Sequence, residues 1–205
     1  MMINFDILPH KPLMIVISGP SGVGKDTVIH ELKRRKFPIH FVITANTSAP
    51  RTEEREGVDY FFVSKENFLD MIARDELIEY SPVYNDFKGI PKAQVVQALE
   101  SGMDVIMRLD VQGAEKIRKI YPDALLIFIV PENEKEWFLR LKTRAGEPPE
   151  DLELRIRTAQ MELGKVHLFD YVVVNSRGKL EDAVDIVTAI ITAEHHRTSP
   201  RSISP

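Results

Sequence analysis

The sequence predicts an α/β fold in which helices cover both faces of a parallel sheet, because two apolar patterns alternate along the chain. Apolar runs without polar alternation, rich in β-branched residues, occupy residues 13–18, 39–44, 105–109, 124–130 and 171–174. Such runs are typical of strands that are buried on both faces. Between them, apolar residues recur at helical spacing, as in residues 26–35, 91–99 and 134–143. A ligand of this fold is expected beyond the carboxyl ends of the strands.

Two stretches depart from this rhythm and are expected to form smaller units within a single domain. Residues 45–88 alternate more and hold short strand-like pieces around an amphipathic helix at 65–74, which indicates a small inserted α+β subdomain. Residues 140–155 combine basic side chains with glycine and proline, a composition that favours a basic lid. The core is then expected to comprise residues 13–44, 89–139 and 156–194, followed by a disordered tail at 195–205.

The composition argues against several classes of protein. A formal net charge of -4 over 205 residues disfavours binding of nucleic acid through a basic surface. No apolar run approaches the roughly 18 residues of a membrane span, and the N-terminus lacks the pattern of a secretory signal. The absence of cysteine removes disulfides and thiolate metal sites and suits a reducing compartment. We therefore expect a soluble cytoplasmic protein, or an organellar one in a eukaryote.

A phosphate-binding loop follows the first expected strand. Residues 19–26 read GPSGVGKD, which places Gly19, Gly24 and Lys25 at the spacing GxxxxGK between a strand and a helix. Glycines let the main chain wrap a polyphosphate with its N–H groups pointing inward, and the helix start adds positive potential. The Lys25 ammonium group can reach the β- and γ-phosphate oxygens. The motif predicts a nucleotide site of the P-loop NTPase type; the alternative is a glycine-rich turn that only connects strand and helix.

Asp26 departs from this motif, which expects a serine or threonine hydroxyl on Mg²⁺ at that position. A carboxylate can hold Mg²⁺ directly or through water, because this ion takes oxygen ligands and retains several waters. Alternatively, Asp26 only stabilises the start of the helix, where acidic residues are favoured. The sequence leaves both interpretations open, and Thr27 follows immediately.

Further motifs, in a fixed order, resemble those of the guanylate kinase family over about residues 13–193. The loop is followed by Arg51, by GVDYFFVS containing Tyr60, by LIEY containing Glu79, by LDVQGA containing Asp110 and by DYVVVN ending in Asn175. Each motif alone is weak, but their order and spacing together are specific. The variants KGIP and RLDVQGA are most similar to the organellar and related bacterial branch of the family.

The resemblance implies a kinase that transfers the γ-phosphate of ATP, with Mg²⁺, to GMP and to dGMP. The ATP site would comprise Gly19, Pro20, Ser21, Gly22, Val23, Gly24, Lys25, Asp26, Thr27 and Asn175. The acceptor site, in the inserted subdomain and nearby, would comprise Thr44, Arg51, Tyr60, Glu79, Lys88, Arg108 and Asp110. The positions that neutralise the transferring phosphoryl group would be Lys25, Arg140, Arg144 and Arg155. The candidate metal ligands are Asp26 and Asp110.

Within the acceptor site, the resemblance implies that Arg51 and Tyr60 hold the acceptor phosphate. It implies that Glu79 accepts hydrogen bonds from the ring N–H and the exocyclic amine of guanine, an edge that adenine does not present. On local grounds alone, Tyr60 also fits an ordinary strand aromatic and Glu79 an exposed strand residue. The basic residues of the lid also fit a solvated helix face with carboxylate partners.

Four residues of the acceptor site depart from the family pattern. Ser48 stands for a second phosphate-binding arginine, Lys88 for a tyrosine, Ile90 for a serine or threonine, and Arg108 for an aspartate. We expect Lys88 and Arg108 to return the positive charge lost at Ser48. One hypothesis is that Arg108 reads O6 and N7 of guanine. Arg108 could equally form an ion pair with Glu79 or Asp110.

Two alternative functions remain open on the sequence alone. Ribose bisphosphate kinases resemble guanylate kinases and can also carry aspartate after the loop lysine, although Arg51, Tyr60 and Glu79 together describe a nucleotide acceptor. A non-catalytic guanylate kinase-like domain that binds protein partners is the other; such domains tend to lose the phosphate loop, which this chain retains. Both a monomer and a homodimer are compatible with the sequence, and neither a nucleic-acid nor a membrane partner is expected.

Overall fold

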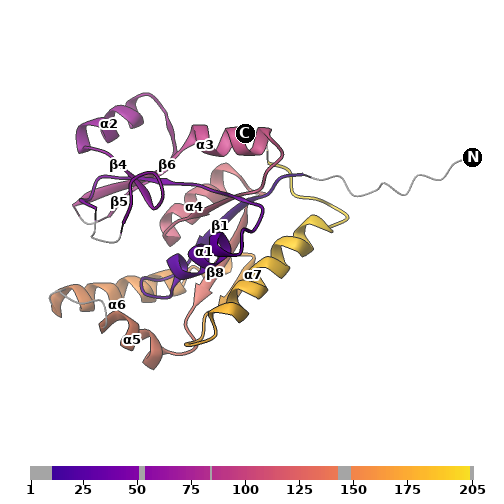
Figure 1. Cartoon of the computed structure of the whole chain (residues 1–205). Coiled ribbons are helices and arrows are strands. Elements are labelled where there is room, and N and C mark those ends of the chain that lie inside the picture. Colours follow the sequence, from indigo (N-terminus) through magenta and orange to yellow (C-terminus); the bar gives the residue numbers. More distant parts are fainter. Residues whose placement is uncertain (1–10, 51–53, 84, 143–148, 204–205) are drawn as a thin grey trace, which may run out of the picture.

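The structure, a computed structural model, describes residues 11–50, 54–83, 85–142 and 149–203. It confirms the α/β fold: a parallel five-stranded sheet in the order β2-β7-β1-β8-β9 has helices on both faces (Figure 1). The strands are β1 (Met14–Ser18), β2 (His40–Phe41), β7 (Val105–Arg108), β8 (Leu125–Val130) and β9 (Tyr171–Val174). Because β1 is central and later strands lie on both sides of it, the loop after β1 starts at the topological switch point.

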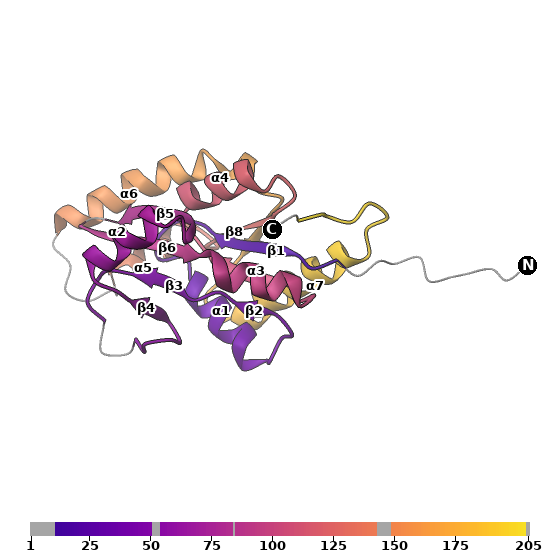
Figure 2. The ribbon, with the colours of Figure 1, turned by 90° about the horizontal axis from the view of Figure 1, so that it is seen from above.

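Alternate residues of β1 enter two different hydrophobic cores, which explains its unbroken apolar run. Ile15 and Ile17 belong to the core on the face covered by α1 (Lys25–Arg34), α5 (Glu134–Lys142), α6 (Pro149–Leu163) and α7 (Leu180–His195). Met14 and Val16 belong to the core on the face of α3 (Lys92–Glu100) and α4 (Val111–Ile120). Figure 2 shows β1 and β8 with α4 on one side and α1 on the other. A 3₁₀ turn at Val166–Leu168 leads from α6 to β9.

A second sheet carries the other side of the site. It has the order β4-β3-β6-β5 and consists of β3 (Thr44–Asn46), β4 (Tyr60–Phe62), β5 (Leu77–Val83) and β6 (Asp86–Pro91). Helix α2 (Lys65–Ala73) packs on it through the fully buried Phe68. In Figure 1 this unit lies at the upper left, and α5 and α6 lie at the lower left.

The prediction of a single strand at residues 39–44 is wrong. The core sheet takes only β2, and the chain then enters the second sheet at Thr44, while β6 runs to Pro91. The run is apolar because Ile39 packs in one core and Val42 in another, and Ala45, the residue after the run, packs in a third. The second sheet therefore extends beyond the expected limits of 45–88 at both ends.

The tail expected to be disordered at 195–205 packs against the core as far as it is described. Helix α7 runs to His195, and Arg201 beyond it is only 10% exposed in its side chain. Its Nε lies 2.8 Å from Oε2 of the buried Glu194, and its guanidinium also pairs with Asp170 at 3.5 Å. Ile203 packs against the core under α3 and α4. The sequence pattern missed this anchor because its partners lie on other elements.

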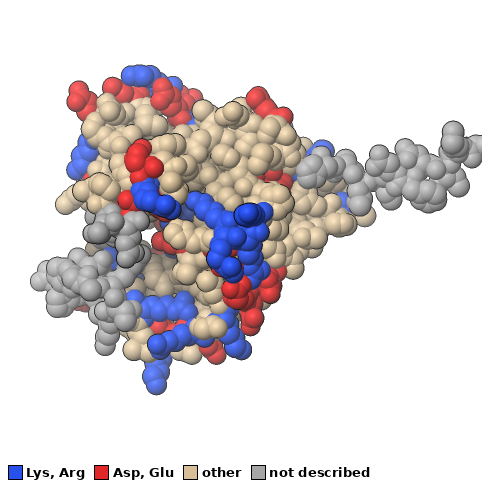
Figure 3. Space-filling view, in the orientation of Figure 1, with Lys and Arg blue, Asp and Glu red and all other residues tan. Residues whose placement is uncertain are grey.

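Basic and acidic side chains lie next to one another on the face in Figure 3. Ion pairs of this kind fasten α7 to α1, where Arg35 contacts both Glu181 and Asp185. Among the helices of the described residues, none is both long and apolar enough to cross a membrane.

Candidate active site

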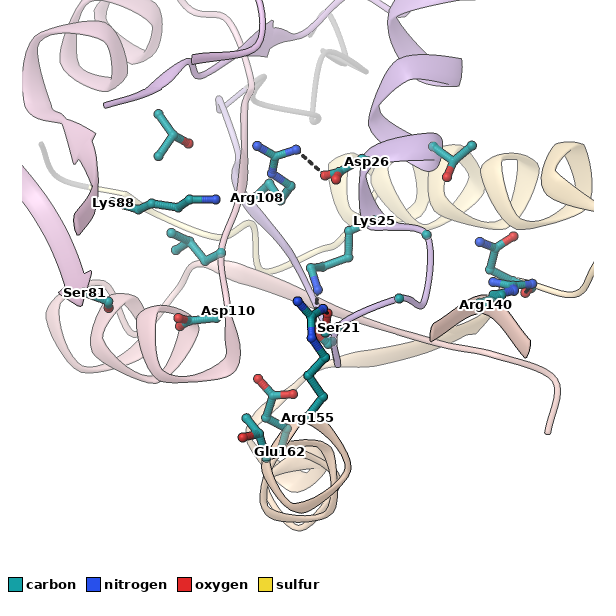
Figure 4. A pocket seen from close by; sticks show the side chains of 18 of the residues that line it. Ser21, Lys25, Asp26, Ser81, Lys88, Arg108, Asp110, Arg140, Arg155 and Glu162 are labelled. Atoms are coloured by element: carbon teal, nitrogen blue, oxygen red, sulfur yellow. Dashed lines mark hydrogen bonds and ion pairs between the residues drawn. The ribbon is translucent and has the colours of Figure 1, made fainter. Parts of the chain in front are cut away.

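A cavity of about 890 Å³ lies where the loop after β1, the second sheet, the start of α4 and helices α5 and α6 meet (Figure 4). It brings together most of the site residues expected from the sequence. Those that line it are Gly19, Ser21, Gly22, Gly24, Lys25, Asp26, Thr27, Thr44, Tyr60, Glu79, Lys88, Arg108, Asp110, Arg140, Arg155 and Asn175. One continuous space therefore joins the expected donor and acceptor residues.

Pro20 and Val23 are expected residues of the described part of the chain that are not among those lining the cavity. The side chains of Pro20 and Val23 are buried behind the loop, so a ligand would meet only their main chain. Arg51 and Arg144 lie outside the described residues. Ile90, at a position where the resemblance implies a base contact, is fully buried in the core under α3 and α4.

The phosphate loop requires glycine at Gly24 for two reasons. Its φ of 93° is in the left-handed region, and a Cβ there would lie 2.3 Å from Nδ2 of Asn175. That same amide donates to the carbonyl of Val23 at 2.9 Å, so it holds the loop from the end of β9. Trp137 packs beneath and donates from Nε1 to the carbonyl of Ser21 at 2.8 Å. The loop is thus preorganised by contacts from two distant elements.

Lys25 opens helix α1 and turns back across the loop. Its Nζ donates to the carbonyls of Gly19 at 2.5 Å and Pro20 at 3.0 Å. Burial lowers the pKa of Lys25 to about 8, against the opposing charges of Glu162 and Asp26. A bound phosphate anion would favour the protonated form, so this ammonium is suited to a triphosphate.

Two arginines reach the loop from the helices below it. Arg140 of α5 donates to the carbonyls of Val23 at 3.1 Å and Asn175 at 2.7 Å. It has a carboxylate partner, Glu136, as the alternative reading expected, but its side chain is only 22% exposed. Arg155 of α6 donates from Nη1 to Oγ of Ser21 at 3.0 Å (Figure 4). Both guanidinium groups therefore face the phosphate loop.

Asp26 and Arg108, which both line the cavity, form an ion pair (Figure 4). Arg108 thus pairs with neither of the expected partners, Glu79 or Asp110. Its guanidinium lies 4.9 Å from the ring centroid of Tyr60, and Nζ of Lys88 lies 4.7 Å from the same centroid. Lys88 also donates to the Tyr60 hydroxyl at 3.3 Å. Two cations and a phenol hydroxyl therefore gather beside the first turn of α1.

Glu79 lies on β5 and is 4% exposed, so its reading as an exposed strand residue is wrong. Its Oε1 accepts hydrogen bonds from the hydroxyl of Ser81 and, at 3.1 Å, from Nζ of Lys116. Burial raises the pKa of the Glu79 carboxyl, which Ser81 and Lys116 oppose. A buried carboxylate with free lone pairs can accept a pair of N–H groups from a base edge.

The candidate metal ligands are separate carboxylates on the cavity wall. Asp110 caps α4 by accepting from the main-chain N–H of Gly113 at 2.7 Å, and Asp26 is paired with Arg108. In the described ranges, no group of three or more His, Cys, Asp or Glu side chains could hold a metal ion. Mg²⁺ bound to a nucleotide takes most of its ligands from phosphates and water and needs only one or two carboxylates. The residues present fit that mode of binding.

Glu162 lines the cavity and was not anticipated from the sequence. Burial raises its pKa to about 7, which the nearby Lys25 opposes and Asp110 reinforces. On α6, Arg155, Thr158 and Glu162 follow one another at spacings of three and four residues, and all three line the cavity. This helical spacing is the signal that would have found Glu162, given Arg155.

Replacing Glu162 by glutamine is expected to stabilise the protein more at pH 8 than at pH 5. The folded-state pKa of about 7 exceeds the ordinary value of 4.5, so ionisation of Glu162 removes stability as the pH rises between them. The gain in the free energy of unfolding at about pH 8 should be about 1 to 2 kcal/mol, and it should become smaller as the pH falls. Urea unfolding of both proteins at the two pH values measures it, and a pH-independent difference would contradict it.

Comparisons with known proteins place these features in a family context. The family model described as "Guanylate kinase" matches residues 11–194. "Guanylate kinase 2, chloroplastic/mitochondrial" of rice, Oryza sativa subsp. japonica, is 46% identical over 197 residues, 96% of this chain and 69% of that protein. The guanylate kinase of Clostridium tetani is 41% identical over 187 residues, 91% of this chain and 88% of that protein.

A solved structure agrees with these similarities. The crystal structure of guanylate kinase from Anaplasma phagocytophilum matches with a TM-score of 0.77 and 29% identity, covering 93% of this chain and 90% of that one. The similarity thus extends over nearly the whole chain, including both sheets and the helices around the cavity.

Proposed function

The chain belongs to the guanylate kinase family, and from this we propose that it transfers the γ-phosphate of ATP to GMP, and to dGMP, by in-line displacement. The family makes it a nucleoside monophosphate kinase; the choice of ATP and of a guanine acceptor is the proposal. One observation carries it: a single cavity is lined both by the phosphate loop and by the buried carboxylate Glu79.

On the donor side, the loop N–H groups and Lys25 bind the triphosphate, with Asn175 beside the loop as a contact for the donor nucleoside. Mg²⁺, when bound with ATP, neutralises phosphate charge and orients the γ-phosphate. Asp26 and Asp110 are the residues proposed to hold it, because both line the cavity near Lys25. Binding of the ion to Asp26 would compete with Arg108 for this carboxylate.

On the acceptor side, Tyr60, Lys88 and Arg108 are proposed to bind the phosphate of GMP, because their polar atoms gather beside α1. Arg51 is expected to join them. Glu79 is proposed to accept the two N–H groups of the guanine edge, with Thr44 supplying a further hydroxyl. A base without that edge would leave a buried carboxylate unmatched, which opposes its binding.

The transfer step needs charge stabilisation more than proton transfer. The attacking oxygen belongs to a phosphate that is already anionic, so no general base is required. Lys25, Arg140 and Arg155, with Arg144 of the expected lid, stabilise the charge on the transferring phosphoryl group. Holding both phosphates in one cavity supplies proximity and keeps water away from the γ-phosphate.

We expect a cytoplasmic location, or an organellar one in a eukaryote. The rice relative is described as chloroplastic/mitochondrial, and the Clostridium tetani relative is bacterial, which fits either location.

A substrate panel tests the proposed function. ADP release from MgATP is measured with GMP, dGMP, AMP, UMP or ribose bisphosphate as acceptor. GMP and dGMP should be used at least about a hundredfold more efficiently than the others. Preferential use of ribose bisphosphate would favour the related sugar kinases, and turnover with none of these acceptors would favour a non-catalytic binding domain.

Replacing Arg108 by methionine is expected to raise the KM for GMP about tenfold, because a charged phosphate contact is lost. The KM for ATP should change less, since the loop and Lys25 are intact. Arg74→Met serves as the control, because Arg74 belongs to the same subdomain and is 68% exposed. Steady-state kinetics with each substrate varied measures both constants. An unchanged KM for GMP would remove Arg108 from the acceptor site.

A further inference from the structure

Lys116 forms an ion pair with Glu79. It lies on α4, which packs against β5, and its Nζ is 3.1 Å from Oε1 of Glu79 and 3.4 Å from Oγ of Ser81. The same ammonium donates to the main-chain carbonyl of Tyr80 and lies 5.5 Å from the centroid of its ring. Glu79 and Ser81 line the cavity, whereas Lys116 is not among its described lining residues.

We propose that Lys116 is a positioning residue for base recognition: it keeps the Glu79 carboxylate ionised and in one orientation, so that the remaining lone pairs accept the guanine N–H groups. This inference rests on the proposed function, because it assumes that Glu79 reads the base. It assigns to a residue outside the cavity a part in the choice of acceptor.

Burial has the largest electrostatic effect on Glu79. The Glu79 side chain is 3% exposed, and burial raises the pKa of its carboxyl, as does the charge of Asp110 at the start of α4. Ser81 and Lys116 act in the opposite direction. Lys88 on β6, in register with Ser81, is the nearest cation of the neighbouring strand, and its ammonium contacts Tyr60. In the part of the chain that the structure describes, the cation in contact with Glu79 is therefore Lys116.

The protonation state of Glu79 matters because it decides whether the carboxyl group accepts or donates a hydrogen bond. An ionised carboxylate only accepts, whereas a protonated one presents an O–H donor to the N–H groups of guanine. Packing also limits the orientation of the Glu79 carboxylate. A Cβ on Gly113 would lie 3.1 Å from Cδ of Glu79, so the first turn of α4 closes one side of the carboxylate. The Lys116 ammonium holds Oε1 on another side.

Lys116→Met in the 205-residue chain tests the proposal, with kinetics at saturating MgATP and varied GMP between about pH 5.5 and pH 9. The KM for GMP should rise about tenfold near neutral pH, with kcat changed less than about twofold. Loss of the cation raises the pKa of Glu79, so more of it is protonated at a given pH. The acid limb of the pH profile of kcat/KM for GMP should therefore shift by about one unit to higher pH. The difference in KM between the variant and the wild type should become smaller as the pH rises. Lys116→Arg should restore most of the affinity.

Two further variants make the test specific. Lys119→Met removes a lysine of the same helix that is 71% exposed and pairs with Glu115, and it should leave every constant unchanged. In a Glu79→Gln background, Lys116→Met should cause a much smaller loss, because the amide does not titrate and only the orienting hydrogen bond is removed.

Several outcomes would overturn the inference. These are a wild-type KM and pH profile in Lys116→Met, an equal loss in kcat and in the KM for ATP, or the same loss in the Glu79→Gln background. If the wild-type protein does not phosphorylate GMP, the proposed function itself fails, and this control precedes every variant.

Discussion

Lys25→Met is expected to lower kcat about a thousandfold, because the variant keeps most of the length of the side chain but removes the charge that is proposed to lie beside the β- and γ-phosphates. In the structure this ammonium already lies across the loop, bonded to the carbonyls of Gly19 and Pro20. The affinity for GMP should be nearly unchanged, since Glu79 and Tyr60 are untouched. A coupled assay of ADP release gives kcat, and calorimetric titration with GMP gives the affinity.

The pH dependence of ATP binding provides a second readout for Lys25. Its pKa of about 8 means that the ammonium loses its proton above that pH, so the affinity of the wild-type protein for ATP should fall as the pH rises through about 8. In Lys25→Met this decline should be absent. A variant that keeps kcat within about tenfold of the wild type would contradict the assigned role.

Arg155→Met is expected to lower kcat by about a hundredfold to a thousandfold, with smaller changes in either KM. The reason is that its guanidinium reaches the loop at Ser21 and can follow charge that develops during transfer. Arg157→Met is the matched control: it lies on the same helix, is 71% exposed and pairs with Glu153 at 2.5 Å. Single-turnover measurements separate the chemical step from product release. Equal losses of kcat in Arg155→Met and Arg157→Met would contradict a role for Arg155 in the transfer step.

The phosphate loop could be predicted from the sequence because its function depends on neighbouring residues. Glycine spacing, Lys25 and the change from strand to helix are all local features, and the left-handed conformation of Gly24 agrees with them. The residues around the acceptor depend on contacts between distant segments. Arg108 pairs with Asp26, which lies 82 positions earlier, and no local pattern distinguishes this partner from Glu79 or Asp110.

The errors have the same physical origin. The run at 39–44 reads as one strand because a hydrophobic pattern shows that residues are buried but not in which of two sheets. The tail reads as disordered because its polar composition does not show that Arg201 meets the buried Glu194. Lys116 resembles any surface lysine until α4 is packed against β5. In each case the missing information is the tertiary partner.

One cavity is expected to hold ATP on the loop and GMP against Glu79 with their phosphates in line. Adenosine and guanosine joined through a chain of five phosphates would span both sites at once. Binding of this compound, measured by calorimetry with Mg²⁺, should be at least about a hundredfold tighter than binding of ATP or GMP alone. It should also be lost by competition with either nucleotide. A compound that binds no more tightly than ATP, or that GMP fails to displace, would contradict the account.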